Sequence, residues 1–336
     1  MTQFFIGRNH SVLTKQQINA GVGSLIGLAV GDALGAPFEF RPAGLYRSTF
    51  PKPVLDGRGE MIGGGAFDWA PGEFTDDTQM ALALSEALIA ADGECEPKRI
   101  WDHFKAWSLG ATDIGNGTRA VLALPSFMTA AREVHEETQK TAGNGSVMRV
   151  APIALAGIQH DSSWVRRAAS AQSKLTHYDG WASNCALVTA DIIYRLITGV
   201  DLAVVLDRVP VNVGPSRRDT FINFMTGDWV PADWDHASNG LSFVCLAQAV
   251  WAVRNTSSFE EAVTTAVNLG DDADTVGAVT GALAGALYGF DQIPARWRNA
   301  LNGQVRQTDG EMKFYDETTL VDIALSLMGA HDVNPM

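Results

Sequence analysis

The chain has 336 residues, of which 46% are hydrophobic and 19% are charged, a composition that excludes extensive disorder. Its formal net charge of -13 repels nucleic acid, so we expect no direct nucleic-acid binding. The same charge repels small anions unless bound cations, backbone amides or helix ends offset it locally.

The cysteines and the first residues indicate where the protein acts. Cys95, Cys185 and Cys245 lie far apart in the sequence, and none forms a CxxC pair. Such a sparse, odd set is typical of a reducing cytoplasm and disfavours a zinc site built from thiolates. Residues 1–17 lack a cationic start followed by an apolar core, so we expect no signal peptide. The sequence therefore predicts a cytoplasmic protein.

The first strongly apolar segment, residues 21–38, is rich in glycine. It is barely long enough to cross a membrane, which takes about 20 predominantly apolar residues, and it contains Asp32, so we expect no membrane association. Glycines recur at every fourth position here and again within residues 268–290, which places each set on one helix face. They are Gly23, Gly27, Gly31 and Gly35, and Gly277, Gly281, Gly285 and Gly289. Because a mid-helix glycine costs about 1 kcal/mol relative to alanine, we expect close contact between helix backbones in return.

Helical periodicity dominates the remaining apolar segments. Apolar residues three and four positions apart predict helices over residues 77–91, 180–199, 241–253 and 259–270. Three further helices are predicted from residues that favour helix starts, namely Pro97, Pro152, and Ser162 or Ser163.

Residues 51–72 contain three prolines and show no helical period, which predicts a long ordered loop, a feature that is often functional. Sustained alternation of Val, Ile, Thr and aromatic residues is absent, so the sequence predicts an all-α protein. No linker composition or charge run divides the chain. We therefore expect a single compact multi-helix domain over residues 16–336, preceded by an N-terminal arm, residues 1–15.

Two crowded groups of carboxylates and threonines each precede an apolar segment with helical spacing. The first acidic cluster is residues 75–78, TDDT, and the second acidic cluster is residues 271–275, DDADT. Asp and Thr are common helix caps, which would account for any single residue here. Capping does not account for the crowding, because like charges 4 Å apart repel by about 1 kcal/mol in water and by several at lower dielectric. Only Arg58 supplies a positive charge between residues 55 and 75.

A divalent cation is the simplest counter-charge for such clusters. Carboxylates and hydroxyls are hard oxygen ligands, which favour Mg²⁺, Mn²⁺ or Ca²⁺ over Zn²⁺. A diphosphate site of an all-α prenyl-transfer enzyme would need the spacing DDxxD, which neither cluster has. The chain also lacks the motifs GxxxxGK[ST], GxSxG and HExxH. From the residues alone, a metal site that joins both clusters and a pair of helix caps are the two alternatives.

Six motifs of this chain occur in the order that is known from one family. They are GSLIGLAVGDALGAPFEF (23–40), PGEFTDDTQMALAL (71–84), DIGNGTRAVL (113–122), GNGSVMRVAPIAL (143–155), THYD (176–179) and GDDADTVGAVTGALAGALYG (270–289). Through these motifs together the chain resembles the ADP-ribosylglycohydrolase family. Bacterial members of that family include the dinitrogenase-reductase-activating glycohydrolase and ADP-ribosylarginine hydrolases.

The resemblance implies the all-α fold of that family and two divalent cations, Mg²⁺ or Mn²⁺, as cofactors. Carried over by position, the implied metal ligands are Thr75, Asp76, Asp77, Asp272, Asp274 and Thr275. Asp271 stands where relatives often have glycine, and we expect it to cap the helix or to lie outside the set of ligands.

The resemblance also implies cleavage of an N- or O-glycosidic bond at the anomeric carbon of the distal ribose of ADP-ribose. Glu39 would act in general acid–base catalysis, and Asp113 would position a water or serve as the alternative base. The glycine-rich turn over residues 143–149 would offer backbone N–H groups to the diphosphate. The implied substrate-binding residues are Gly143, Asn144, Gly145, Ser146, Met148 and His177.

The implied function is removal of ADP-ribose from a modified protein, most directly from arginine, so the expected partner is an ADP-ribosylated protein. Serine-linked ADP-ribose, O-acetyl-ADP-ribose and a small-molecule glycoside are alternatives within the same enzyme class. A different alternative is a binding or immunity protein that neutralises a partner ADP-ribosyltransferase, with or without hydrolase activity, and the N-terminal arm would serve that role. The intact set of metal ligands together with Glu39 favours the enzyme.

Overall fold

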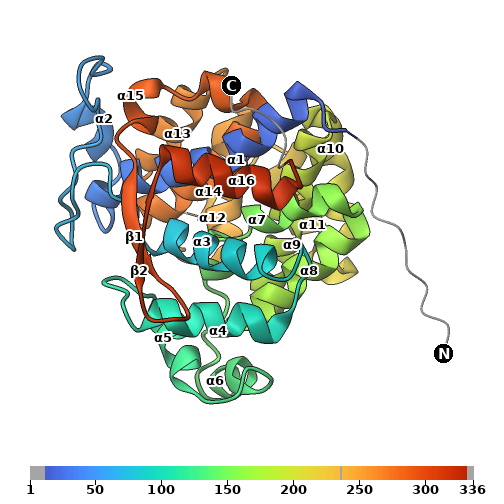
Figure 1. Ribbon diagram of the computed structural model, residues 1–336. Coiled ribbons are helices and arrows are strands. Elements are labelled where there is room, and N and C mark those ends of the chain that lie inside the picture. The colour runs from blue at the N-terminus through green and yellow to red at the C-terminus, as the bar shows by residue number, and fades with distance from the viewer. Residues whose placement is uncertain (1–11, 235–236, 331–336) are drawn as a thin grey trace.

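The computed structural model describes residues 12–234 and 237–330, and most of these lie in helices (Figure 1). The helices are α1 (Lys15–Gly35), α2 (Leu45–Thr49), α3 (Asp76–Ile89), α4 (Pro97–Ser108), α5 (Asn116–Ala123), α6 (Ala130–Thr138), α7 (Ala151–Ala156), α8 (Ser162–Lys174), α9 (Gly180–Ile197), α10 (Leu202–Arg208), α11 (Pro215–Thr226), α12 (Ser242–Arg254), α13 (Phe259–Val267), α14 (Ala273–Tyr288), α15 (Ala295–Arg298) and α16 (Glu317–Met328). The strands are β1 (Asn302–Arg306) and β2 (Met312–Asp316). The predicted all-α class is confirmed, because this strand pair is the only sheet within the described residues.

Helices α1 and α14 run antiparallel through the centre of the molecule, and their glycines form the contact between them (Figure 1). A Cβ atom added at Gly27 would overlap the carbonyl oxygen of Gly281, and one added at Gly281 would overlap that of Gly27. The same reciprocal relation joins Gly31 to Gly277. The close backbone contact expected from the glycine spacing is therefore present, and it brings the end of α1 against the start of α14.

The glycine-rich apolar segment lies mostly within helix α1. By length and composition this helix could cross a membrane, but 94% of its apolar 18-residue stretch is buried within the molecule. Thr14 caps this helix, since its Oγ1 accepts a 3.2 Å hydrogen bond from Gln17 N, and Gln17 Oε1 accepts one of 2.9 Å from Thr14 N. The helix thus begins at Lys15, within the segment assigned to an N-terminal arm, and residues 1–11 of that arm lie outside the described residues.

The helices predicted from periodicity correspond to observed ones. The four predicted spans match α3, α9, α12 and α13, and the three predicted starts fall at the beginnings of α4, α7 and α8. The hairpin was not predicted from the sequence, and neither were the helices α2, α5, α6, α10, α11, α15 and α16. Its strands pair with Asn302 opposite Asp316 and Arg306 opposite Met312. Each strand has five residues, which is too short for alternation to stand out from the surrounding sequence.

The long loop over residues 51–72 is ordered as predicted and contains no helix or strand among the elements described. A buried carboxylate holds it in place. Glu60 Oε1 accepts a 2.8 Å hydrogen bond from Val54 N within the loop, and Glu60 Oε2 accepts one of 2.6 Å from Trp297 Nε1 of α15. Because Glu60 is 2% exposed, these bonds fasten the loop to the core rather than to its surface.

Candidate active site

Both acidic clusters stand at the start of a helix, but neither supplies a cap to its own helix. Thr75 precedes α3 and Asp272 precedes α14, and neither side chain accepts a hydrogen bond from the helix that follows. Thr75 Oγ1 donates to Asp32 instead, and Asp272 accepts from Asn144. Helix capping therefore does not explain why these two residues are present.

Asp32, on the buried surface of α1, caps α3 from outside. Its Oδ2 accepts 3.0 Å hydrogen bonds from the backbone nitrogens of Thr75 and Thr78, and one of 2.5 Å from Thr78 Oγ1. Its Oδ1 accepts a 2.8 Å bond from Thr75 Oγ1. The contact of α1 with α14 brings the same residue toward Asp274, so Asp32 lies where the two acidic clusters meet.

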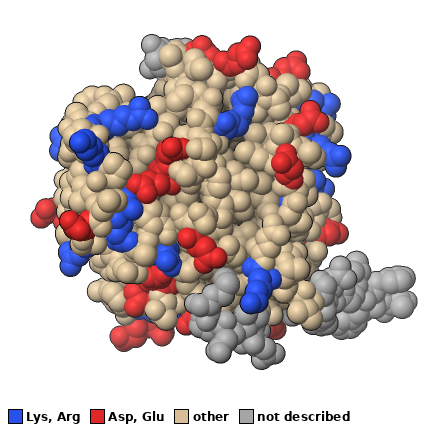
Figure 2. Space-filling model, turned by 90° about the horizontal axis from the view of Figure 1, so that it is seen from above, with Lys and Arg blue, Asp and Glu red and all other residues tan. Residues whose placement is uncertain are grey.

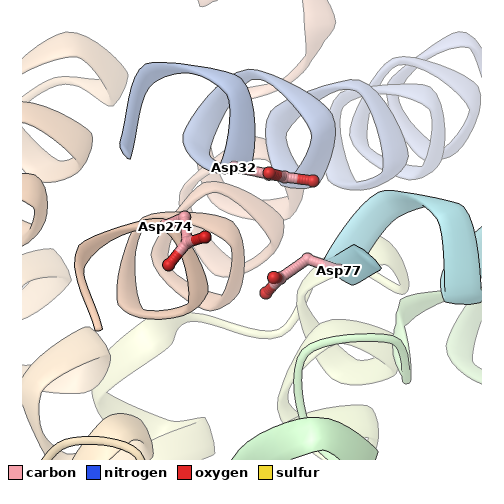
Figure 3. Close-up of side chains that lie close together, drawn as sticks. All are labelled: Asp32, Asp77 and Asp274. Carbon is pink, nitrogen blue, oxygen red and sulfur yellow. The ribbon is translucent and has the colours of Figure 1, made fainter. Parts of the chain in front are cut away.

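Five carboxylates form two overlapping groups. Asp32, Asp77 and Asp274 make the inner group, and their side chains lie close together, extending from α1, α14 and the start of α3 (Figure 3). Glu39, Asp272 and Asp274 make the outer group. Within each group, one oxygen from each residue lies within 4.8 Å of the others. Asp274 belongs to both groups, which is the arrangement expected of two adjacent cation sites that share a ligand.

The oxygen atoms in these groups fit a hard divalent cation. Asp77 Oδ1 and Glu39 Oε2 are buried, and neither has a hydrogen-bond partner among the described residues. Buried polar atoms without a partner are rare in folded proteins and point to an ion or a ligand. Thr75 Oγ1 and Thr275 Oγ1 lie 3.3 and 3.4 Å from Asp77 Oδ2, so hydroxyls from both clusters surround one carboxylate. Carboxylate and hydroxyl oxygens are the ligands that Mg²⁺ and Mn²⁺ prefer.

Burial raises the pKa of four of these carboxyl groups, namely Asp32, Glu39, Asp77 and Asp274. Burial, reinforced by the neighbouring carboxylates, raises the pKa of Asp77 and Asp274 well above the usual range. Burial, together with the charges of Asp113 and Asp272, raises the pKa of Glu39 to about 8. A bound cation would reverse this preference, because it favours the ionised form of each group.

A cleft of about 560 Å³ opens over the outer group and collects most of the predicted site. The predicted residues in its lining are Glu39, Asp76, Asp113, Gly143, Asn144, Gly145, Met148, His177, Asp272, Asp274 and Thr275. The lining also includes residues that the sequence analysis did not single out, among them Phe40, Phe67, Asn116, Thr118, Arg119 and Lys140. Residues from each of the six motifs thus converge on one cavity.

Three predicted residues lie beneath the cleft rather than in its lining. Thr75 and Asp77 belong to the inner carboxylate layer and are 0% and 1% exposed. Ser146 is also buried; its Oγ accepts a 2.8 Å hydrogen bond from Ser173 Oγ, and its carbonyl accepts one of 2.8 Å from Gln172 Nε2. The Ser146 side chain therefore fastens the glycine-rich turn to α8, and its part in substrate binding stays a prediction.

The glycine-rich turn is tied directly to the second acidic cluster. Asn144 Nδ2 donates a 2.9 Å hydrogen bond to Asp272 Oδ2 and one of 3.1 Å to the carbonyl of Asn239. Asn239 in turn accepts a 2.9 Å bond at its Oδ1 from Asp272 N. Asn144 thus orients a carboxylate of the outer group. The sequence analysis assigned this residue only to substrate binding.

Asp271 lies outside both carboxylate groups, as expected. Its φ of 56° is in the left-handed region that favours glycine. Its backbone nitrogen donates to the Arg41 carbonyl at 2.8 Å, and its carbonyl accepts from Phe40 N at 2.6 Å. Asp271 Oδ2 accepts a 3.1 Å bond from Ser238 Oγ. Asp271 therefore joins the segment that carries Glu39 to the loop on the other side of the cleft.

Asp32 is the one member of the two carboxylate groups that the sequence analysis did not assign to the site. In the sequence it stands out only as a charge that disfavours a membrane span. A sharper signal was available, because an acidic residue within an apolar, glycine-spaced helix must be buried, and a buried carboxylate needs partners.

The electrostatic surroundings can accommodate an anionic ligand despite the net charge. Arg119 and Lys140 both contribute to the lining of the cleft. On the face shown in Figure 2, Lys and Arg are interspersed with Asp and Glu, and they form no continuous basic surface among the described residues. Positive charge is thus present locally at the cleft, where it can offset the charge of an anionic ligand.

Comparisons with known proteins agree with this geometry. A family model described as ADP-ribosylglycohydrolase matches residues 14–331. The chain is 35% identical to the ADP-ribosylarginine hydrolase Tri1 of Serratia proteamaculans (strain 568), over 89% of this chain and 80% of the relative. It is 31% identical to the ADP-ribosyl-[dinitrogen reductase] glycohydrolase of Rhodospirillum rubrum, over 85% of this chain and 91% of the relative.

A solved structure shows the same fold. It is described as an ADP-ribosylglycohydrolase-related protein complex, and it matches 94% of this chain and 99% of its own with a TM-score of 0.74 and 33% sequence identity. The family match, these relatives and the two carboxylate groups beneath one cleft agree with one another. The chain therefore belongs to the ADP-ribosylglycohydrolase family and is a glycohydrolase.

Proposed function

We propose that this enzyme hydrolyses the N-glycosidic bond between ADP-ribose and an arginine side chain of a modified protein, with the help of two divalent cations. The observation that carries the proposal is the convergence of Asp32, Asp77 and Asp274 with Glu39 and Asp272 at the base of one cleft. Mg²⁺ or Mn²⁺ would be held by the inner and outer carboxylate groups, with the hydroxyls of Thr75 and Thr275 beside them. When bound, the cations would polarise the ribose hydroxyls and the attacking water.

Glu39 and Asp113 are the residues suited to move protons. Both line the cleft, and Glu39 Oε2 has no hydrogen-bond partner among the described residues, so no other described side chain competes for a proton on this atom. In the reaction, a water oxygen bonds to the anomeric carbon and the bond from that carbon to nitrogen breaks. The nitrogen keeps the electron pair and gains a proton. Glu39 would take the proton from water or deliver it to that nitrogen, and Asp113 would position the water or act as the alternative base.

The rest of the cleft suits the ADP-ribosyl group. Arg119 and Lys140 can offset the diphosphate charge, and the turn over residues 143–149 offers backbone N–H groups. His177 lines the same wall of the cleft. These features support binding of ADP-ribose, while the choice of arginine rests on the relatives, two of which are named as ADP-ribosylarginine hydrolases.

The test is release of free ADP-ribose from matched peptides that carry ADP-ribose on arginine or on serine, with Mg²⁺, with Mn²⁺ and after chelation. We expect release from the arginine peptide only when a cation is present. Release from the serine peptide alone would contradict the arginine assignment. Full activity after exhaustive chelation would contradict the metal dependence.

The alternative function, neutralisation of a partner ADP-ribosyltransferase by binding, stays a prediction. The arm that it invokes lies mostly in residues 1–11, outside the described part of the chain. Deletion of residues 1–11 separates the two roles, because loss of partner binding with hydrolysis retained would support both. The predicted cytoplasmic location likewise stays a prediction.

A further inference from the structure

Arg149, the last residue of the glycine-rich turn over residues 143–149, carries a buried charge that the proposed reaction does not use. It is 0% exposed, and its guanidinium bonds to neutral groups. Nε donates to Gln172 Oε1 at 2.9 Å, and Nη2 donates to the Gln172 carbonyl at 3.1 Å and to Thr176 Oγ1 at 2.8 Å. The guanidinium also lies over the ring of Phe104, 4.3 Å from its centroid. Burying a charge is costly unless it is well hydrogen-bonded, so this arrangement indicates a specific role for the cation.

The bond from Arg149 to Thr176 decides where the Thr176 hydroxyl proton points. Thr176 is 1% exposed, and its Oγ1 lies 2.8 Å from His177 Nδ1. A hydroxyl has one proton and two lone pairs. One lone pair is directed at the positive guanidinium, and Nδ1 is the only other hydrogen-bond partner of this hydroxyl among the described residues, so the hydroxyl has an acceptor for its proton only if it donates to Nδ1. Nδ1 of His177 then accepts a hydrogen bond, so the ring carries its own proton on Nε2.

Nε2 lies against the glycine-rich turn at the wall of the cleft. A Cβ atom added at Gly145 would come within 2.9 Å of His177 Cε1 and 3.1 Å of Nε2, and one added at Gly143 within 3.5 Å of Nε2. The two glycines therefore leave the room that the imidazole occupies. His177 is 5% exposed and contributes to the cleft lining, so its N–H edge is the part that a bound ligand can reach.

We propose that Arg149 and Thr176 are positioning residues that hold His177 as an Nε2–H donor for an acceptor oxygen of ADP-ribose. The inference rests on the proposed function only in naming ADP-ribose as the ligand; the direction of the hydrogen bonds stands on the contacts of the protein alone. The bond from Arg149 to Thr176 also joins the end of the glycine-rich turn to the first residue of the THYD motif.

The protonation state of His177 agrees with this role. Burial, reinforced by the charge of Arg149, lowers the pKa of His177 to about 3. The ring is therefore neutral at physiological pH, and a neutral imidazole has one donor nitrogen and one acceptor nitrogen. A neutral His177 therefore presents a donor to the cleft only when the proton is held on the nitrogen that faces the cleft.

The first test reads the tautomer directly. We expect ¹⁵N NMR of the Mg²⁺-loaded wild-type enzyme at neutral pH to show His177 with its proton on Nε2 and none on Nδ1. A proton on Nδ1, or on both nitrogens, would overturn the proposal. This measurement needs no ligand and no variant, so it decides the question even if a substitution prevents folding.

The second test compares threonine variants for ADP-ribose binding by calorimetry. Thr176→Val removes the hydroxyl at nearly constant volume, and we expect about tenfold weaker binding, the scale for one lost hydrogen bond to a charged group. Thr176→Ser keeps the hydroxyl and should restore most of the affinity. Thr189→Val is the matched control, because it removes another buried hydroxyl, whose one hydrogen bond among the described residues goes to the Cys185 carbonyl at 2.8 Å, and it should leave the affinity unchanged.

A kinetic readout separates positioning from mere support of the fold. Because the donor contacts bound ADP-ribose, Thr176→Val should raise KM more than it lowers kcat, and Arg149→Lys should yield both tautomers of His177, since lysine lacks the planar fork. Thr176→Val with wild-type affinity and an unchanged tautomer would overturn the inference. A wild-type enzyme that neither binds nor releases ADP-ribose would instead overturn the proposed function and leave the tautomer result standing.

Discussion

The two acidic clusters look alike in sequence, but the structure holds them in different ways. The first cluster depends on a third element, because Asp32 of α1 accepts the hydrogen bonds at the start of α3. In the second cluster, Asn144 and Asn239 bond to Asp272, and the Asp271 backbone pairs with the segment that follows Glu39. The first cluster is thus fastened to the core, and the second is fastened to the walls of the cleft.

This difference assigns separate tasks to similar residues. The inner group, which includes Asp77, lies in the tightly packed core and can set the position of a cation. The outer group, which includes Asp272 and Glu39, shares its contacts with segments that line the cleft and would meet the substrate. Asp274 belongs to both groups and couples the two tasks. Substitutions in the inner group and in the outer group should therefore have different effects.

The largest effect is expected at Asp274. Asp274→Asn removes the one carboxylate that both groups share, so we expect loss of both cations and at least about 10³-fold slower hydrolysis, the upper scale for removing one preorganised electrostatic group. Asp271→Asn is the matched control, because this neighbouring aspartate lies outside both groups and asparagine tolerates its positive φ. Kinetics, metal content and far-UV circular dichroism would be measured for both. Equal losses in the two variants would contradict the account.

Asp32→Asn tests the dependence of the first cluster on α1. Both carboxylate oxygens of Asp32 accept hydrogen bonds, so an amide NH₂ group would face a donor in either orientation. Because Asp32 orients Thr75 and also belongs to the inner group, we expect Mg²⁺ affinity to fall by at least about 10- to 100-fold, the range known for residues that orient metal ligands. Isothermal titration with Mg²⁺ would measure this change. Unaltered affinity in a folded variant would show that the first cluster does not need Asp32.

Gly281→Ala tests whether the glycine contact brings the clusters together. The added Cβ would overlap the carbonyl oxygen of Gly27 across the interface. We expect the free energy of unfolding to fall by about 1–3 kcal/mol, the usual cost of overpacking, together with weaker Mg²⁺ binding. Denaturant titration would measure the first effect. Gly214→Ala is the control, because a Cβ there would meet open space; a similar loss in both variants would argue against the contact.

The smallest effect concerns the metal-free protein and pH. Burial raises the pKa of Asp32 to about 6 and that of Glu39 to about 8 in the folded state. The folded state therefore binds more protons than the unfolded chain between about pH 4 and pH 8, and the free energy of unfolding decreases as the pH rises through that window. We expect a lower Tm at pH 8 than at pH 5 without metal, and a larger gain from Mg²⁺ at pH 8. Calorimetric scans in which the Tm of the metal-free protein rose from pH 5 to pH 8 would contradict this prediction.

Much of the fold could be predicted because helices leave a periodic signal in the sequence. The spacing of apolar residues located α9 and α12 closely, and the four-residue glycine spacing predicted a backbone contact. The spacing did not say which helices would pair, since any glycine face could meet any other. The hairpin β1–β2 was not predicted, because two five-residue strands contain too few residues to establish an alternation of apolar and polar side chains.

The site was predictable where chemistry is concentrated in short motifs. Glu39, Asp113, Asp272 and Asp274 do converge on one cleft or its base. Asp32 and Thr176 were not predicted to act there, because their roles arise from partners that lie far away in sequence. A hydrogen bond from Arg149 to Thr176, or from Thr75 to Asp32, exists only once the helices have packed.

The central claim is that the two acidic clusters meet to hold a pair of cations. Anomalous diffraction from crystals grown with Mn²⁺ tests it most directly. We expect two peaks, one bounded by Asp32, Asp77 and Asp274 or the threonines beside them, and one bounded by Glu39, Asp272 and Asp274. The absence of any peak at these carboxylates, in crystals of enzyme that still hydrolyses its substrate, would contradict the account.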